Sequence, residues 1–256
     1  MNIVALNRKP IFDAVRGLLG RAFTQDEVDA LDRAIDSALG ASGEERGTRL
    51  GSLSEQFESG GRGPGVVSGG HGDPGGVSYG IYQLASKTGT AARFLQSEGR
   101  PWAGMFGKAT PGSATFSKVW REVAEREPDA FAAAQHAFIE RTHYRPTVAA
   151  VLDATGLDLD SRHQAVRDAT WSVAVQHGRA ARIMIGAVSQ ADADFARDNA
   201  TAYDRALIEA IYAQRSRYVL GVADRSGAAG ARMLRSVVAN RYPAELKAAL
   251  AMLGEA

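Results

Sequence analysis

The chain has 256 residues and contains no cysteine. This absence excludes a disulfide framework, a thiol nucleophile and a cysteine-ligated zinc site. The sequence also lacks any run of about 18 apolar residues, so it predicts no membrane span. Its first ten residues include no apolar segment long enough for a secretory signal, and we therefore expect none. The length is sufficient for one or two domains with a buried core.

Neither sign of charge is in excess. The chain has 30 basic and 29 acidic residues, which gives a formal net charge of +1. A nucleic-acid-binding domain normally has a clear basic surplus, so no nucleic acid partner is expected. The letters GVSYG at 76–80 match G-x-S-x-G, but this segment reads as a strand and not as the strand-to-helix turn of a nucleophile elbow, and the sequence has no phosphate-binding loop. These features argue against a serine hydrolase with a nucleophile elbow and against a nucleotide-binding enzyme.

Two carboxylates flank a glycine-rich stretch. Glu58 follows a short helical run that starts at a capping box, Ser52-x-x-Glu55, and Asp73 precedes a strand-like segment at 77–84. Glycine-rich backbone is tolerated where the chain needs positive φ or approaches a ligand closely. Two carboxyl groups held across a site are what cleavage of a glycosidic bond requires, one as an acid and one as a base, nucleophile or stabilising charge.

The two carboxylates are expected to have different roles. Glu58 falls at the C-terminal end of its short helix, where the helix dipole and desolvation beside Phe57 would raise its pKa, as a general acid needs. Asp73 would activate the attacking water or stabilise positive charge in the transition state. Asp-Pro-Gly is also ordinary turn chemistry, so a purely structural Asp73 remains open.

The order of these residues resembles a known family. Glu58, the letters DPGGVSYG at 73–80 and the interval of 15 residues between Glu58 and Asp73 are similar to the chitosanase-like muramidase domains of phage endolysins and type VI cell-wall effectors. The resemblance is dense over residues 50–90, and a second block lies at 171–178. Gly75 departs from the family pattern, which usually has Arg or Asp there.

The resemblance implies a mainly α, lysozyme-like fold with a small β-hairpin or sheet beside the active-site cleft. It implies an enzyme, a muramidase that cleaves the β-1,4 bond between N-acetylmuramic acid and N-acetylglucosamine in bacterial peptidoglycan. Glu58 would be the general acid and Asp73 the second carboxylate. The protein would be a monomer without a cofactor, made in the bacterial cytoplasm and acting on the periplasmic cell wall after release by a holin or a secretion system.

Five further residues are candidates for substrate binding. Tyr82 and Gln83 would contact the N-acetyl groups or orient Glu58, and Ser78 would hold the attacking water. By resemblance, Gln176 and His177 would also line the cleft. Each has a structural alternative: Ser78 as a partner of local backbone, Tyr82 as a core residue, and His177 as a partner of the last carbonyls of its helix.

Three other functions remain open. Glu58-Ser59 followed by Gly80-x-Tyr82-Gln83 also resembles soluble lytic transglycosylases, in which Glu58 alone would serve as acid and base. A chitosanase is a second alternative, although the balanced charge gives it little support. The third is a non-catalytic wall-binding or phage structural module. His136, Glu140 and His143 share a helical face, but nothing else supports a metal, and none is predicted.

The chain divides into three predicted parts. Residues 1–40 form a helical hairpin, 41–51 a linker and 52–256 the catalytic domain. The linker is rich in Gly, Ser, Glu and Arg. Beyond residue 87 the pattern is helical, with expected ends at Pro128, Pro146 and Pro243. The expected helices cover about 88–98, 116–126, 129–143, 146–155, 162–177, 179–188, 192–220, 227–240 and 243–253.

Overall fold

A computed structural model describes residues 50–53, 63–70 and 75–254, together with Val15, Arg21 and Glu27. The chain divides into two compact units, residues 1–47 and residues 48–256. The predicted N-terminal hairpin lies almost wholly outside the described residues, as do Glu58 and Asp73. In the first unit, the Arg21 guanidinium donates to the Glu27 carboxylate. The predicted boundaries at 40 and 51 stay predictions.

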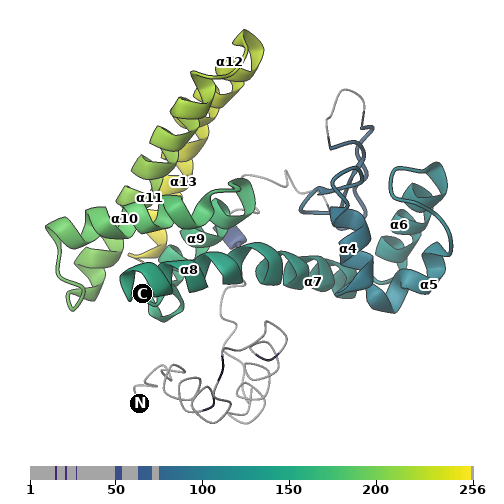
Figure 1. Ribbon diagram of the computed structural model, residues 1–256, viewed down its shortest axis with the longest axis horizontal. Helices are drawn as coiled ribbons and strands as arrows, with labels where there is room; N and C mark the ends of the chain where they lie inside the picture. The colour runs from purple at the N-terminus through teal and green to yellow at the C-terminus, as the bar shows by residue number, and fades with distance from the viewer. Residues whose placement is uncertain are drawn as a thin grey trace. The chain divides into compact units, whose positions relative to one another are not determined.

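The second unit is mainly helical, with one small sheet (Figure 1). Two short strands precede α4 and the helices that follow it, in agreement with the small hairpin expected there. The elements are β1 (Ser78–Tyr79), β2 (Leu84–Ala85), α4 (Thr90–Gln96), η1 (Arg100–Trp102), α5 (Ala103–Phe106), α6 (Ala114–Arg126), α7 (Pro128–Ile139), η2 (Glu140–Tyr144), α8 (Arg145–Thr155), η3 (Leu159–Ser161), α9 (Gln164–Gln176), α10 (Ala180–Asp194), α11 (Ala200–Ala223), α12 (Ala228–Ser236), η4 (Val237–Arg241) and α13 (Tyr242–Met252).

One long helix joins the two ends of this unit (Figure 1). It consists of α7, η2 and α8 in direct succession, from Pro128 to Thr155. Helix α6 packs on its first half, whereas α9 and α10 pack on η2 and α8. The sheet and α4–α6 therefore lie toward one end of the long helix, and α9–α13 toward the other (Figure 1). The mainly α, lysozyme-like fold predicted from the sequence is confirmed.

The predicted helix ends at Pro146 and Pro243 are wrong. In both places the chain passes through a π-helical turn, Glu140–Tyr144 or Val237–Arg241, and continues as a helix with the proline in its first turn. Proline lacks the N–H that an α-helix would use and clashes with the carbonyl four residues earlier. A π turn widens the helix locally and relieves both problems, so the axis continues where sequence rules predict a stop.

A third boundary also differs. The sequence predicted helices at 179–188 and 192–220, but α10 continues to Asp194 and α11 begins at Ala200. The side chain of Asn199 accepts from the amide of Ala202 at 3.5 Å and so caps α11. Asparagine is a preferred N-cap, so the sequence contains a local signal for this helix start that the predicted boundaries did not use.

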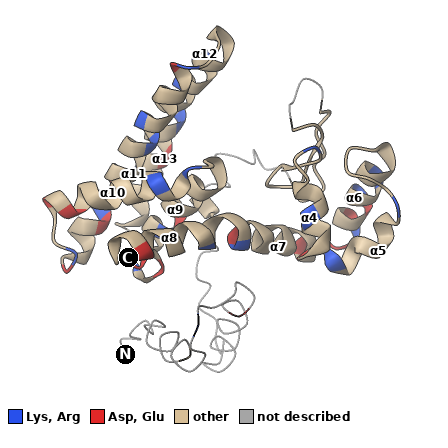
Figure 2. Ribbon diagram, in the orientation of Figure 1, with Lys and Arg blue, Asp and Glu red and all other residues tan. Residues whose placement is uncertain are grey.

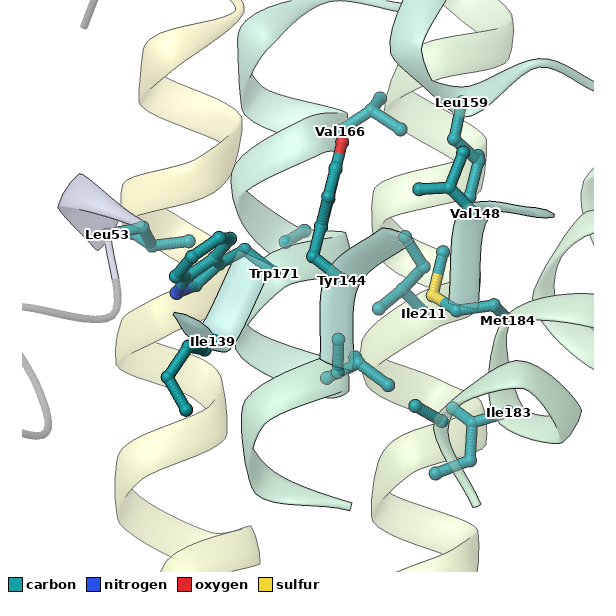
Figure 3. Close-up of a cluster of buried hydrophobic side chains, with 14 of the residues drawn as sticks. Leu53, Ile139, Tyr144, Val148, Leu159, Val166, Trp171, Ile183, Met184 and Ile211 are labelled. Carbon is teal, nitrogen blue, oxygen red and sulfur yellow. The ribbon is translucent and has the colours of Figure 1, made fainter. Parts of the chain in front are cut away.

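An apolar cluster runs through the described residues of the second unit. Figure 3 shows one part of it, in which Leu53, Trp171 and Tyr144 lie together with side chains of α8, α10 and α11. The Trp171 ring is fully buried and its centroid lies 5.7 Å from that of Tyr144. Trp171 is therefore a core residue and not an exposed sugar platform. Leu53 is 1% exposed, so the segment that precedes Glu58 packs into this core through its side chain.

The small sheet is held against the long helix by Gln135. Strands β1 and β2 are antiparallel, with Tyr79 opposite Leu84. The Gln135 side chain is fully buried; its Oε1 accepts from the amide of Ile81 at 3.0 Å, and its Nε2 donates to the carbonyl of Pro64 at 3.1 Å. Gly80 has φ of +73°, and a Cβ there would lie 2.1 Å from the Gln135 Oε1. Only glycine allows this approach.

We predict that Gly80→Ala lowers the free energy of unfolding by about 2 to 4 kcal/mol, because it combines a left-handed backbone with a collision against Gln135. Gly89→Ala is the matched control. Gly89 has φ of +74°, but a Cβ there would meet nothing within 4 Å. The control should therefore cost only about 1 kcal/mol. Urea unfolding measures both, and equal losses would contradict the role given to Gln135.

Candidate active site

The two predicted catalytic carboxylates, Glu58 and Asp73, lie outside the described residues, but the chain on either side of each is described. Residues 50–53 precede Glu58, residues 63–70 lie between the two carboxylates, and residues from 75 onward follow Asp73. The candidate site is therefore defined by what holds these three flanking segments. Each segment is bonded to α6, α7 or α9, or to its neighbouring segment.

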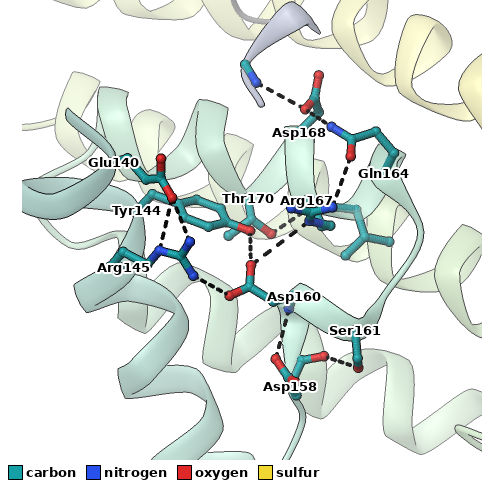
Figure 4. A network of polar contacts seen from close by, with 12 residues as sticks. Glu140, Tyr144, Arg145, Asp158, Asp160, Ser161, Gln164, Arg167, Asp168 and Thr170 are labelled. Carbon is teal, nitrogen blue, oxygen red and sulfur yellow. Dashed lines mark hydrogen bonds and ion pairs between the residues drawn. The ribbon is translucent and has the colours of Figure 1, made fainter. Parts of the chain in front are cut away.

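Asp168 of α9 holds the first segment (Figure 4). Its carboxylate accepts from the amides of Gly51 at 3.1 Å and Leu53 at 3.0 Å, and from the Ser52 hydroxyl at 2.7 Å. Residues 52 and 53 are helical. A carboxylate that accepts from the first amides of a helix satisfies groups with no partner inside the helix and suits the positive end of its dipole. The Asp168 side chain is fully buried, so water does not compete for these bonds.

The predicted capping box at Ser52 and Glu55 is thus replaced, at least in part, by a cap from a distant helix. The Ser52 hydroxyl donates to Asp168, and Glu55 lies outside the described residues. Asp168 follows these residues by more than a hundred positions. Local sequence rules consider only neighbouring residues and could not identify this carboxylate as the cap.

Asp168 belongs to a larger polar network (Figure 4). Gln164 donates to it at 2.8 Å and accepts from Arg167 at 3.2 Å. Farther along, Asp160 accepts from the Tyr144 hydroxyl at 2.7 Å and from Arg145 at 2.9 Å. Burial, followed by the nearby Asp160 charge, raises the pKa of Tyr144, so its hydroxyl stays protonated and remains a donor. The network joins α9 to the π turn of the long helix.

Three aromatic rings surround the same segment. His136 stacks on Trp171 with ring centroids 4.4 Å apart, and its Nε2 lies 2.7 Å from the Leu50 carbonyl oxygen. Gly51 has φ of +91°, and a Cβ there would lie 2.6 Å from Trp171 Nε1. The Tyr82 ring lies edge-on to both His136 and Trp171, at 6.2 and 6.1 Å. The hairpin turn with Tyr82 and the segment preceding Glu58 therefore meet at one place.

The second and third segments pair with each other. Ser68 donates its amide to the carbonyl of Ser78 at 2.9 Å, and the amide of Ser78 donates to the Ser68 hydroxyl at 2.8 Å. A Cβ on Gly70 would lie 2.9 Å from the amide nitrogen of Val77. The chain on the two sides of Asp73 is thus in contact. Trp120 and Gln135 both donate to Pro64, so this paired element is anchored on α6 and α7.

The structure brings three of the five predicted binding residues into one element. Ser78 lies in β1, and Tyr82 and Gln83 lie in the turn between β1 and β2. Ser78 is buried, Tyr82 is half-buried and Gln83 is exposed. Gln83 has φ of +52°, the one left-handed non-glycine residue among those described. Such backbone is disfavoured by about 1 kcal/mol or more and is often found at binding sites. Substrate contact by these residues stays a prediction.

Gln176 and His177 belong to a different cluster. Arg215 of α11 donates to the Gln176 side chain and, from Nε, to His177 Nε2 at 3.1 Å. The Tyr242 hydroxyl donates to Gln176 at 2.9 Å. Among the described residues, no hydrogen bond or ring contact joins this pair to Tyr82 or Gln83. Their proposed contact with substrate stays a prediction, and the contacts described here give them a packing role.

A fully buried ion pair lies at the centre of that second cluster. Arg215 Nη1 is 2.7 Å from Glu245 Oε2, and both side chains are 0% exposed. Ser172 and Tyr212 also donate to Glu245, and the Arg215 guanidinium lies 4.3 Å from the Tyr242 ring centroid. Burial, followed by the charges of Arg215 and Arg241, lowers the pKa of His177 to about 3. His177 is therefore neutral at physiological pH and accepts from Arg215.

No group of His, Asp and Glu side chains suited to a metal ion is found in the described part of the chain. His136, of the trio considered from the sequence, instead bonds the Leu50 carbonyl and stacks on Trp171. Sequence reasoning missed Asp168 and Gln135, the two side chains that anchor the flanks of the carboxylate stretch. A signal for Asp168 exists: it is the one acidic residue of α9, a helix rich in apolar residues, and a buried charge requires a partner.

Comparison with known proteins identifies the family. The family model described as "Type VI secretion system spike protein VgrG3-like, C-terminal" matches residues 50–243. The chain is also 40% identical over 140 residues to the type VI secretion system spike protein VgrG3 of Vibrio cholerae serotype O1. That alignment covers 55% of this chain and 14% of the spike protein, so the chain is similar to a small part of it.

These matches correct the family suggested by the sequence. The resemblance to chitosanase-like muramidase domains of phage endolysins and type VI cell-wall effectors named the wrong family, because the model that matches is the VgrG3-like C-terminal one. The error has a clear cause. The motif around Glu58 and Asp73 is short, whereas the match to the correct family extends through the helices to residue 243.

We predict that Asp168→Asn lowers the free energy of unfolding by about 2 to 4 kcal/mol. Each Asp168 oxygen accepts from two donors, so an amide group in place of one oxygen would face two donors without an acceptor. Asp153→Asn, at an exposed position of α8, is the control and should change stability by less than about 0.5 kcal/mol. Similar stabilities of the two variants would contradict the capping role of Asp168.

We also predict that His177 makes stability fall with acidification. Its pKa is 6.5 in the unfolded chain and about 3 in the fold, so between these values only the unfolded chain binds the proton. The stabilisation is present above pH 6.5 and is lost as the pH falls toward 3. From pH 7 to pH 5, wild type should lose about 1 to 2 kcal/mol more than His177→Gln. Urea unfolding at both values tests this, and parallel losses would refute it.

Proposed function

The chain belongs to the VgrG3-like C-terminal family of type VI secretion system spike proteins, and from this membership we propose that it is a glycosidase of bacterial peptidoglycan. It cleaves the β-1,4 bond between N-acetylmuramic acid and N-acetylglucosamine, with Glu58 as general acid and Asp73 as the second carboxylate. The observation that carries the proposal is the anchoring of the chain around these two residues by Asp168, Gln135 and Trp120.

The anchoring supports catalysis because catalytic groups need fixed positions. A glycine-rich stretch has little apolar surface and cannot order itself by packing. Here, buried side chains of α6, α7 and α9 hold the backbone before Glu58 and on both sides of Asp73. A merely structural loop would not need three separate buried anchors. An enzyme gains from them because small displacements of an acid or base from its substrate are costly in rate.

The proposed reaction is an acid–base hydrolysis. Glu58 donates a proton to the glycosidic oxygen as the bond to the leaving sugar breaks, and positive charge develops on the other sugar. Asp73 either removes a proton from the attacking water or stabilises that charge electrostatically. Tyr82 and Gln83, which lie in the turn between β1 and β2, are proposed to contact the sugar. No step requires a metal or another cofactor.

The type VI family also suggests how the enzyme would reach its substrate. We propose delivery by the secretion system to the periplasm of a neighbouring cell, where peptidoglycan lies. The alignment covers 14% of the Vibrio cholerae spike protein. The delivery route and any further partners are therefore part of our proposal for this chain. Within the described residues, no helix is long and apolar enough to cross a membrane.

The decisive experiment digests purified peptidoglycan and identifies the products by mass spectrometry. Glu58→Gln should lower the rate by at least about a hundredfold with the fold intact, because general acid catalysis supplies about 10²- to 10⁴-fold. Glu125→Gln, at an exposed position of α6, makes the same chemical change away from the site and should digest normally. Near-normal digestion by Glu58→Gln would refute the assignment.

The end groups and the Asp73→Asn variant separate the mechanisms. Reducing N-acetylmuramic acid ends, with a rate that falls at least about tenfold in Asp73→Asn, support the two-carboxylate hydrolase. Anhydro ends would instead indicate a lytic transglycosylase that uses Glu58 alone. Reducing N-acetylglucosamine ends would mean cleavage of the other bond. If wild type releases no muropeptides, the chain is a binding module and the enzymatic proposal is wrong.

A further inference from the structure

Basic residues gather on one part of the chain although the whole is nearly neutral. Residues 216–241, here called the arm, comprise the end of α11, α12 and η4, and they include five arginines and one acidic residue. The whole chain has 30 basic and 29 acidic residues. Figure 2 shows these basic positions along the ribbons of α11 and α12. Helix α12 packs on α11 and lies beyond the body of α9 and α10 (Figure 1).

Most of this charge has no internal partner. Arg235 is paired with Asp224, the one acidic residue of the arm, at 2.9 Å, and Arg241 is paired with Glu245. Arg217, Arg225 and Arg232 are exposed, and none forms an ion pair with a described residue. Among the described residues, the Arg217 guanidinium donates to the neutral side chain of Gln214 at 3.1 Å. Asp224 is also the sequence neighbour of Arg225, but its carboxylate pairs with Arg235, so the arm presents three arginines that form no ion pair with a described residue.

The exposed arginines of α6 have a different setting. Arg121 and Arg126 of α6 are also exposed, but Glu122, Glu125 and Glu127 lie beside them in the sequence. Mixed charges of this kind are typical of an ordinary solvated surface. On the arm the same-sign charges repel one another, and a bound anion would relieve this repulsion. The concentration of charge is therefore a better indication of a binding surface than the exposure of any one arginine.

The apolar side of the arm is already occupied. Leu234, Val237 and Val238 are partly buried against the hydrophobic core. Of the larger apolar side chains there, Met233 is 64% exposed and Leu220 is 38% exposed. A helix that lies in a membrane surface needs a continuous exposed apolar face as well as cations. Because that face is turned inward here, the arm fits a polar anionic polymer better than a lipid bilayer.

We propose that the arm binds the carboxylates of peptidoglycan stem peptides through Arg217, Arg225 and Arg232. Guanidinium groups match carboxylates in geometry and bind them through two parallel hydrogen bonds. This inference rests on the proposed function, which makes peptidoglycan the substrate. The arm is a second contact with the same polymer. It would keep the enzyme on the wall between cuts, because two linked contacts bind more strongly than either alone.

The test is sedimentation of the chain with purified, insoluble peptidoglycan sacculi. Binding is measured with the Glu58→Gln protein, which should digest the sacculi only slowly, and with wild type on ice. The triple variant Arg217→Gln, Arg225→Gln, Arg232→Gln should bind sacculi about tenfold more weakly, because three exposed ion pairs are lost. The control triple Arg121→Gln, Arg126→Gln, Arg205→Gln removes the same charge from exposed positions of α6 and α11. The control should bind within about twofold of the parent.

Two further measurements test the chemistry of the partner. Converting the stem-peptide carboxylates to neutral amides should lower binding of the parent to the level of the arm triple. Binding should also weaken between about 0.05 M and about 0.5 M salt, through screening. Equal losses in both triples, or undiminished binding to amidated sacculi, would overturn the proposal. So would tighter binding to vesicles of phosphatidylglycerol and phosphatidylcholine than to sacculi.

The outcome is separable from that of the enzymatic proposal. With Glu58 intact, the arm triple should cleave small soluble muropeptide fragments at the wild-type rate, because the arm contacts only the extended polymer. An inactive wild type that still sediments through its arm would refute glycosidase activity and leave arm binding intact. An active enzyme whose arm triple sediments normally would refute arm binding alone. Thermal unfolding of both triples confirms that the charge changes leave the fold unchanged.

Discussion

One buried carboxylate determines where the chain enters its glycine-rich stretch. Asp168 receives hydrogen bonds from residues 51, 52 and 53 and from Gln164, and its side chain is shielded from water. A buried carboxylate is tolerated only when its oxygens are satisfied, so these contacts are mutually dependent. If the segment moved, the carboxylate would be left without donors. The energetic cost of leaving the carboxylate buried and unpaired fixes the segment against α9 more firmly than apolar packing alone.

The second anchor works by a different means. Gln135 joins the β1–β2 turn and Pro64 through an amide that donates on one side and accepts on the other. A neutral amide can do this because it has both donor and acceptor atoms, whereas a carboxylate only accepts. The two anchors come from α9 and α7, and both of these helices contact η2, the π turn of the long helix. The site is therefore built on two helices that both pack against the π turn of the long helix.

Sequence reasoning predicted the composition of the fold better than its connections. The helical region beyond residue 87 and the strand-like character of residues 77–84 follow from periodicity, which is local, whereas the small hairpin was expected from the family resemblance. The ends at Pro146 and Pro243 were wrong because a proline rule describes α-helices and not π turns. Asp168 was missed because its partners are distant in sequence. The family was misassigned because the resemblance was drawn from short motifs, whereas the model that matches covers the helices as far as residue 243.

The two π turns have a consequence for how the long helices tolerate change. Each residue of an α-helix rotates the following ones by about 100°, so the residue count between two points sets which faces point in the same direction. The turn at Glu140–Tyr144 lies between the part of the long helix that holds the hairpin through Gln135 and the part that meets α10. Loss of a single residue there would leave a continuous helix but rotate its second half relative to its first. The helical phase across this turn, and not only the identity of its side chains, is thus part of what the sequence must preserve.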